Sequence, residues 1–195
     1  SLIIPVDSEH NAIFQILTSS GIEYNHLGIS SSNNIKKITL TASGGPFLGF
    51  SKRKLSKVTP KEATRHPTWK MGKKISVDSA SMINKGLEVI EAAILFKLKP
   101  SQIDILIHPQ SIVHGLVTFS DGSTISHMSN HDMRIPISYA LSWPKRSELN
   151  INFKAENILD NLTFKKIHPG SYKCLDLCIK ALAVGKNAPT ILNAA

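Results

Sequence analysis

Aromatic residues, cysteines and long apolar runs are all scarce in this sequence, and their scarcity narrows the class of protein. Aromatic residues make up 6% of the 195 residues, and they do not alternate with basic residues as in a nucleic-acid-binding groove. Two cysteines, Cys174 and Cys178, cannot form a disulfide framework, so we expect them to fill a core. No apolar run approaches the roughly 18 residues that span a bilayer. The hydrophobic content of 42% is enough for one core, or for one domain and part of another.

Acidic residues are also few: the sequence has 14 aspartates and glutamates against 23 lysines and arginines, which gives a net charge of +9. A basic chain attracts anions. The basic residues are scattered along the chain, so we expect a small anionic substrate and neither nucleic acid nor a membrane as partner. A basic RNA-binding protein is the alternative from a different class, and a steep salt dependence of RNA binding would identify it.

Hydrophobic periodicity predicts an α/β (α+β-like) fold, in which helices cover a mixed sheet. The predicted strands are residues 2–6, 35–41, 103–107 and a hairpin of 112–119 with 123–128. The predicted helices are residues 10–18, 79–96, 133–141 and 172–184, and a capping box at Thr59–Glu62 marks a further helix start near Thr59. No G-x-G-x-x-G fingerprint of a dinucleotide-binding turn occurs in the sequence.

A weakly patterned stretch divides the chain. We expect an α/β or α+β domain at residues 1–142, a linker at 143–170, and the start of a further, helical domain at 171–195. The chain begins at Ser1 and stops within a predicted helix at Ala195, so we expect it to be part of a longer protein. Whether a targeting peptide precedes Ser1 is not decided by this sequence.

Two carboxylates lie close together near the start, at Asp7 and Glu9. If residues 2–9 are extended, both side chains point to the same side and require a cation between them. Carboxylate oxygens select a hard or borderline divalent ion such as Mg²⁺ or Mn²⁺ rather than Zn²⁺. The alternative is a solvated strand end, with Glu9 beginning a helix where the dipole favours an acid.

A second polar group follows at Ser79, Asn84, Lys85 and Glu88, of which Asn84, Lys85 and Glu88 share one face of the predicted helix. Gly86 within that helix costs about 1 kcal/mol relative to alanine, which suggests the close approach of a ligand. Hydroxyl, amide and ammonium groups near a helix start suit a phosphate. The alternative is an ordinary ion pair on a solvated helix.

Two loops complete the candidates. Ser43 and the glycines that follow it have backbone N–H groups that could approach an anion, or they form a simple turn. Residues 66–72 hold His66, Trp69 and Met71 between predicted helices, as a mobile lid or as a packed connection. The histidines of the predicted hairpin, including His114, have no carboxylate nearby in sequence and are not expected to bind zinc.

Taken together, these runs resemble the 1-deoxy-D-xylulose 5-phosphate reductoisomerase family. The similar runs are IPVDSEHNA (4–12), SGGPF (43–47), HPTWKMGKKISVDSA (66–80), Met82 with NKGLE (84–88), IHPQS (107–111), DGS (121–123), DMR-x-P (132–136) and LNAA (192–195). They occur in the family's order and weaken between residues 144 and 172. Several long runs in order are far more specific than any single motif. The resemblance implies that residues 1–142 are the catalytic domain that binds metal and sugar phosphate, and that residues 171–195 are the truncated start of a C-terminal helical domain. It also implies that the family's N-terminal Rossmann-type domain is absent from this chain.

The resemblance implies a role for each candidate. The implied metal ligands are Asp7, Glu9 and Glu88, with Glu9 and Glu88 also catalytic. The implied substrate contacts are Ser8, Glu9, Ser43, His66, Ser79, Asn84, Lys85 and Glu88. The implied cofactor contacts are Met71 and Gly72, and the implied lid residues are His66, Trp69 and Met71.

The implied reaction is the NADPH-dependent rearrangement and reduction of 1-deoxy-D-xylulose 5-phosphate to 2-C-methyl-D-erythritol 4-phosphate, in the non-mevalonate route to isoprenoid precursors. The implied cofactors are NADPH and a divalent metal (Mg²⁺, Mn²⁺ or Co²⁺). A homodimer in the bacterial cytoplasm is the implied setting, and we expect this chain by itself to be inactive. A metal-dependent sugar-phosphate isomerase or aldolase without a redox step is the alternative enzyme.

Overall fold

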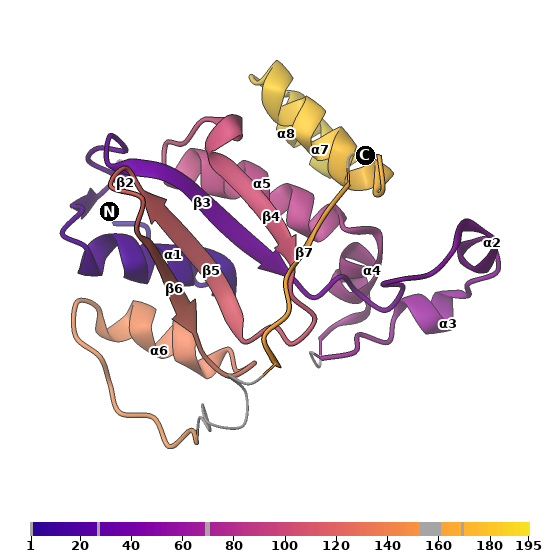
Figure 1. The fold of residues 1–195 in the computed structure, drawn as a ribbon, viewed down its shortest axis with the longest axis horizontal. Helices are drawn as coiled ribbons and strands as arrows, with labels where there is room; N and C mark the ends of the chain where they lie inside the picture. The colour runs from indigo at the N-terminus through magenta and orange to yellow at the C-terminus, as the bar shows by residue number, and fades with distance from the viewer. Residues whose placement is uncertain (1, 27, 69–70, 153–160, 169) are drawn as a thin grey trace.

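A five-stranded mixed sheet forms the centre of the computed structural model, which describes residues 2–26, 28–68, 71–152, 161–168 and 170–195 (Figure 1). In spatial order the strands are β6 (Thr124–Met128), β5 (Val113–Phe119), β3 (Ile35–Ala42), β4 (Ile103–Ile107) and β7 (Lys165–Lys166). Strands β3 and β4 run parallel, and the other neighbours run antiparallel. A separate two-stranded ribbon joins β1 (Tyr24–Asn25) and β2 (Gly28–Ile29). The predicted fold class is confirmed.

The main core lies where helices α1 (Ser8–Ser19) and α5 (Ile83–Leu95) pack with β3 and β5. Ile38 and Leu40 of β3 are two residues apart, so they point to the same face, and both are fully buried with Phe14 of α1. Each such side chain contributes about 1.5–3 kcal/mol on burial. Helix α6 (Arg134–Ser142) adds Tyr139, whose ring meets that of Phe14 edge-on at 6.2 Å.

The helix predicted over 79–96 is in fact two helices. Helix α4 (Lys73–Ser81) ends at Met82, whose φ of 63° lies in the left-handed region, and α5 begins at the next residue. The Met82 side chain is buried with Ala42 and Ile107, and this packing offsets the backbone strain. The prediction failed because methionine is not a helix breaker; tertiary packing imposes the break.

The strand expected at residues 2–6 is also wrong, because that described stretch has no strand. Asp7 stands at the N-terminus of α1 and Glu9 lies in its first turn. Asn11 Nδ2 donates to the Pro5 carbonyl at 2.9 Å and so occupies an acceptor that a strand would have paired. One part of the alternative interpretation is confirmed, namely that Glu9 lies at the start of a helix.

Two short helices, α2 (Lys52–Leu55) and α3 (Pro60–Ala63), form an arm beside α4 (Figure 1). The predicted capping box of α3 is present: the Thr59 N–H donates to Glu62 Oε2 at 2.8 Å, and the Glu62 N–H donates to Thr59 Oγ1 at 3.4 Å. Neither helix buries a residue. Local sequence signals therefore suffice to start this helix, while the rest of the arm stays exposed.

Helices α7 (Lys173–Val184) and α8 (Ala188–Ala194) end the chain, and α7 lies against α5 (Figure 1). Gly86 of α5 is approached by Cys178 of α7, so the expectation that its missing side chain makes room for a ligand is wrong. Strand β7 falls within the expected linker yet pairs with β4. Among the described residues, no helix is both long and apolar enough to cross a membrane.

Candidate active site and metal centre

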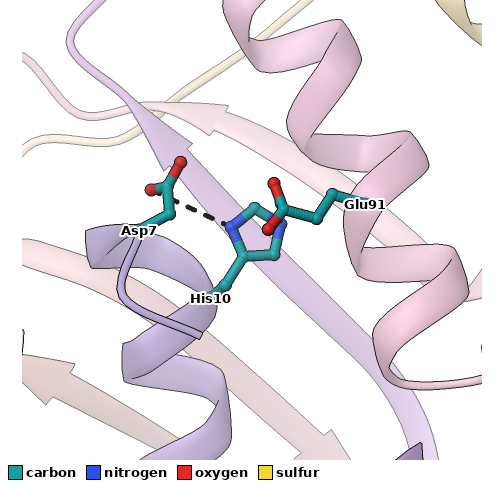
Figure 2. A group of neighbouring side chains, drawn as sticks. All are labelled: Asp7, His10 and Glu91. Carbon is teal, nitrogen blue, oxygen red and sulfur yellow. Dashed lines mark ion pairs between the residues drawn. The ribbon is translucent and has the colours of Figure 1, made fainter. Parts of the chain in front are cut away.

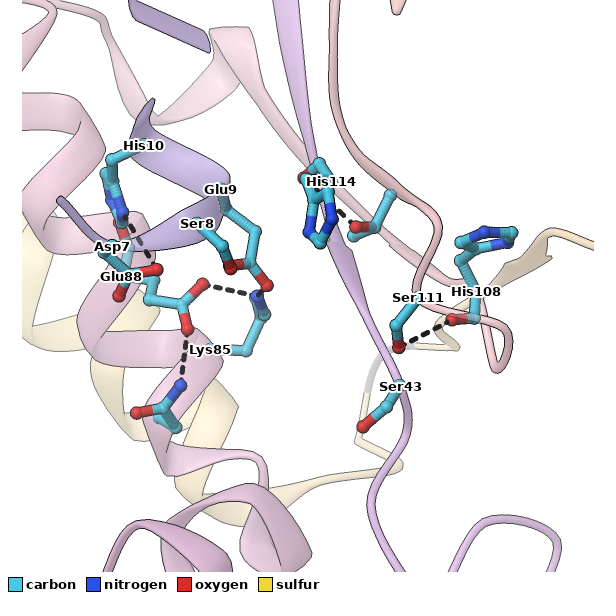
Figure 3. Close-up of polar contacts among 12 residues, drawn as sticks. Asp7, Ser8, Glu9, His10, Ser43, Lys85, Glu88, His108, Ser111 and His114 are labelled. Carbon is cyan, nitrogen blue, oxygen red and sulfur yellow. Dashed lines mark hydrogen bonds and ion pairs between the residues drawn. The ribbon is translucent and has the colours of Figure 1, made fainter. Parts of the chain in front are cut away.

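Three carboxylates converge where α1 meets α5 (Figure 3). Asp7 and Glu9 come from the first turn of α1, and Glu88 comes from the second turn of α5. One carboxylate oxygen from each lies within 4.8 Å of the others. The expected convergence is therefore present, although helix geometry rather than strand alternation produces it.

A buried lysine sits among these carboxylates. Lys85 Nζ donates to Glu9 Oε1 at 2.6 Å and forms a second ion pair with Glu88, one helical turn away on α5. The Asn84 amide donates to the other Glu88 oxygen, and the Ser8 hydroxyl donates to Glu9. The polar residues predicted from the two sequence segments thus form one network, and Lys85 is part of it.

Burial and mutual repulsion set the charges in this network. The pKa of the Glu88 carboxyl lies well above its ordinary value, because burial and the Glu9 and Asp7 charges outweigh the attraction of Lys85. Burial opposes the charge of Lys85, but the neighbouring glutamates raise the pKa of that ammonium above its usual range. The raised Glu88 pKa favours the neutral carboxyl, and the raised Lys85 pKa favours the charged ammonium.

His10 of α1 lies between two carboxylates, those of Asp7 and Glu91, as Figure 2 shows. Its ring is fully buried; Nε2 donates to the Glu88 carbonyl at 2.9 Å, and Nδ1 lies 3.8 Å from Asp7 Oδ1. Burial disfavours the charged ring, but Asp7 prevails and raises the pKa of His10 to about 9. The same ion pair holds the pKa of Asp7 well below its usual range despite burial. His10 therefore keeps Asp7 ionised.

The second side of the site is made by the loop after β3 and the segment before α4. His66 Nδ1 accepts the Thr68 N–H at 3.2 Å, so in the neutral ring Nε2 carries the proton and donates to Ser43 Oγ at 2.9 Å. A side chain at Gly45 would come within 2.7 Å of the Ser79 carbonyl. Glycine thus brings the loop close to the end of α4, which carries Ser79.

A cavity of about 290 Å³ opens between these two sides. Most of the predicted residues line it: Asp7, Ser8, Glu9, Ser43, His66, Met71, Ser79, Asn84, Lys85 and Glu88. Gly72 does not; it is exposed and precedes the first turn of α4. Trp69, predicted as a lid anchor, lies outside the described residues. The size of the cavity suits a small molecule.

Sequence reasoning missed several residues of the cavity wall, among them Thr41, Ser111, His114 and Met133. His114 was set aside because no carboxylate lies near it in sequence, yet folding brings it to the same cavity as Glu9. Burial lowers the pKa of His114, and the Glu9 charge opposes that shift. The one sequence signal that could have identified His114 as a cavity residue is its position close to the similar run at 107–111.

The carboxylate group fits a divalent metal ion. Its donors are all oxygens, as Mg²⁺ and Mn²⁺ prefer. Burial raises the pKa of Glu88, and the Glu9 and Asp7 charges add to that shift; a divalent cation would favour the ionised carboxylate. Asp7, His10 and Glu91 fit less well, because the Asp7 and Glu91 oxygens lie near opposite nitrogens of the His10 ring.

Comparison with known proteins agrees with this geometry. Two family models match: "1-deoxy-D-xylulose 5-phosphate reductoisomerase C-terminal domain" at residues 3–96, and "DXP reductoisomerase C-terminal domain" at residues 128–195. The reductoisomerase of Buchnera aphidicola subsp. Schizaphis graminum is 50% identical over 98% of this chain and 48% of its own length. That of Laribacter hongkongensis is 46% identical over all of this chain and 49% of its own.

Solved structures give the same result. A reductoisomerase crystallised with NADPH, fosmidomycin and magnesium has a TM-score of 0.87 and 42% identity, over 98% of this chain and 47% of that one. The Zymomonas mobilis enzyme with NADPH has a TM-score of 0.83 and 39% identity, over 97% and 46%. The chain thus spans about half the length of these relatives. The two domain models, the relatives and the structures agree that this chain belongs to the 1-deoxy-D-xylulose 5-phosphate reductoisomerase family.

Proposed function

We propose that this chain supplies the metal and sugar-phosphate site of an enzyme that converts 1-deoxy-D-xylulose 5-phosphate to 2-C-methyl-D-erythritol 4-phosphate with NADPH. The observation that carries the proposal is the convergence of Asp7, Glu9 and Glu88 on a cavity of substrate size. Relatives that bind NADPH and magnesium support the cofactors. The product would enter the non-mevalonate route to isoprenoid precursors.

Asp7, Glu9 and Glu88 would hold the divalent ion, whether Mg²⁺, Mn²⁺ or Co²⁺. When bound, such an ion supplies Lewis-acid polarisation and a template for neighbouring carbonyl and hydroxyl oxygens. His10 would keep Asp7 ionised for this role. Glu9, which lies beside Ser8 and Lys85, is our candidate for proton transfer at the sugar hydroxyls.

The phosphate end of the substrate would lie between the two sides of the cavity. Ser43 and His66 line one side, and Ser79 and Asn84 line the other. A neutral His66 with Nε2–H toward the cavity would donate a hydrogen bond to the phosphate, in place of its present contact with Ser43. Lys85 would contribute a charge-assisted hydrogen bond from the junction of the metal and phosphate ends.

The nicotinamide end of NADPH would meet the lid side of the site at Met71 and Gly72. Met71 lines the cavity, which supports its role, while Gly72 lies just outside it. The rearrangement would give a branched aldehyde, which NADPH then reduces. A lid formed by His66, Trp69 and Met71 would exclude water from this aldehyde before hydride transfer. Hydride transfer also needs the rest of the dinucleotide held in position, so we expect no turnover by these 195 residues without a nucleotide-binding domain.

A homodimer is the proposed assembly. Helix α6 exposes Ile137 and Leu141, and the edge strand β6 exposes Ile125 and Met128. Exposed apolar side chains of this kind favour association between copies. Bacterial relatives support a cytoplasmic setting.

A chimera tests the function directly. This chain replaces the matching half of the Buchnera reductoisomerase, and NADPH oxidation is followed with 1-deoxy-D-xylulose 5-phosphate and Mg²⁺. We expect turnover that Glu88→Gln lowers by roughly a hundredfold or more, since removing one charge-stabilising group typically costs 10²–10³. Asp104→Asn, at an exposed acid of β4, is the matched control and should leave turnover unchanged.

Two results would contradict the proposal. Rearrangement of the substrate without NADPH oxidation would point to the isomerase or aldolase alternative. A chimera that folds but is indifferent to Glu88→Gln would show that the carboxylate group is not the metal site.

A further inference from the structure

Helix α5 is held between the candidate site and helix α7. At 100° per residue, Gly86 and Glu88 lie about 160° apart around the helix axis, so they occupy nearly opposite faces. The Glu88 face meets α1 at the carboxylates, and the Gly86 face meets Cys178 of α7. A displacement at one face must therefore move the other.

The contact at Gly86 has no spare room. A Cβ atom added there would lie 2.4 Å from Cys178 Sγ, 2.6 Å from Cys178 Cβ and 3.6 Å from Leu175 Cα. The first two distances fall about 1 Å below the 3.4 Å at which ordinary van der Waals contact begins. Residue 86 thus sets how closely α7 can approach α5.

Neither helix can retreat freely. Leu175 of α7 is buried with Ala42, Met82 and Ile107, so α7 is fixed to the end of the sheet. On the far side of α5, the Glu88 carbonyl accepts a hydrogen bond from His10 of α1 at 2.9 Å. A methyl group at position 86 would push α5 toward α1 and change the spacing of the carboxylates.

We propose that Gly86 is a positioning residue, whose close contact with Cys178 sets where α5 presents Lys85 and Glu88 to the metal-binding carboxylates. This inference rests on the proposed metal site and adds α7 to the residues that control it. Burial raises the pKa of the Cys178 thiol to about 11, so this side chain packs as a neutral group rather than as a nucleophile.

Mn²⁺ binding to the 195-residue chain, measured by electron paramagnetic resonance, tests the proposal without any turnover. Gly86→Ala should weaken Mn²⁺ binding by roughly tenfold to a hundredfold, the usual cost of disturbing the support of metal ligands. Adding Cys178→Gly should restore most of the affinity, because it removes both crowded atoms. Adding Cys178→Ala should not, because the Cβ atom at 2.6 Å remains.

Leu177→Gly is the matched control, since it places the same helix-weakening residue on α7 at a side chain that is 51% exposed. It should neither change Mn²⁺ binding nor rescue Gly86→Ala. If Gly86→Ala does not fold, Cys178→Gly alone decides: weaker Mn²⁺ binding than in Leu177→Gly supports the contact, and equal binding overturns it.

The outcomes separate this inference from the proposed function. Wild-type affinity in a folded Gly86→Ala variant, or rescue by Leu177→Gly, would overturn the positioning role and leave the metal site intact. A wild-type chain that binds no Mn²⁺ would overturn the metal site, and the positioning role with it.

Discussion

Two groups of charged side chains in this protein differ in burial. The buried group contributes to the stability of the fold, whereas the exposed group mainly interacts with water. Lys85 lies among Glu9 and Glu88 at the junction of α1 and α5, with 5% of its side chain exposed. The arm of α2 and α3 carries Lys52, Arg53, Lys54, Lys57, Lys61 and Arg65, all exposed to solvent. Water screens the second group, whereas the first interacts through a medium of low polarity. We therefore expect large effects from one lysine at the junction and small effects from any in the arm.

Lys85→Met gives the largest expected effect. It removes the cation between two buried carboxylates while keeping the length of the side chain, and breaking such a group typically costs about 3–5 kcal/mol of unfolding free energy. Mg²⁺ should restore part of this loss, because it can neutralise the same carboxylates. Urea unfolding with and without Mg²⁺ measures both effects. Lys54→Met in the arm is the control, and equal losses in the two variants would remove the distinction between the groups.

His127 is a partly buried histidine whose surroundings favour the neutral ring, so it tests the effect of burial on a single titrating group. Burial and the nearby His114 lower its pKa to about 4. Between pH 6.5 and 4 the unfolded chain binds a proton that the folded chain rejects, so stability is intact above pH 6.5 and falls as the pH drops. The loss should reach about 3 kcal/mol.

The measurement for His127 is urea unfolding across this pH range in wild type and in His127→Gln. The variant should lose less stability on acidification than wild type, whereas His26→Gln, at an exposed position, should behave as wild type. Parallel pH profiles for wild type and His127→Gln would show that His127 does not carry the effect.

Thr59→Ala tests the arm itself. The substitution removes the hydroxyl that caps α3, at a typical cost of about 1 kcal/mol. Because α3 buries no residue, we expect faster amide hydrogen exchange within α3 and little change in global unfolding. A global loss as large as the local one would mean that the arm is coupled to the core.

The ion pair between Lys37 and Asp104 should show the smallest effect. It joins β3 to β4, with 41% and 55% of the two side chains exposed. A double-mutant cycle with Lys37→Ala and Asp104→Ala should give a coupling below about 1 kcal/mol that shrinks further with added salt. A coupling as strong as that of Lys85 would contradict the role given to burial.

The sequence by itself determined the features that depend on local chemistry. Periodicity predicted β3, β4, the hairpin and α7 within a few residues, because alternate and helical spacing of apolar residues reflects which face is buried. The capping box at Thr59 followed from side-chain hydrogen bonding within one turn. The similar runs pointed to the carboxylates and to most of the cavity residues before any geometry was known.

Only the tertiary structure decided how those parts meet. The break at Met82 depends on packing with Ala42 and Ile107, which are distant in sequence, so no local pattern announces it. His114 reaches the cavity and Cys178 reaches Gly86 for the same reason. The carboxylates converge because α1 and α5 share one core, where burying apolar side chains brings Asp7, Glu9 and Glu88 close enough to need Lys85 or a metal ion between them.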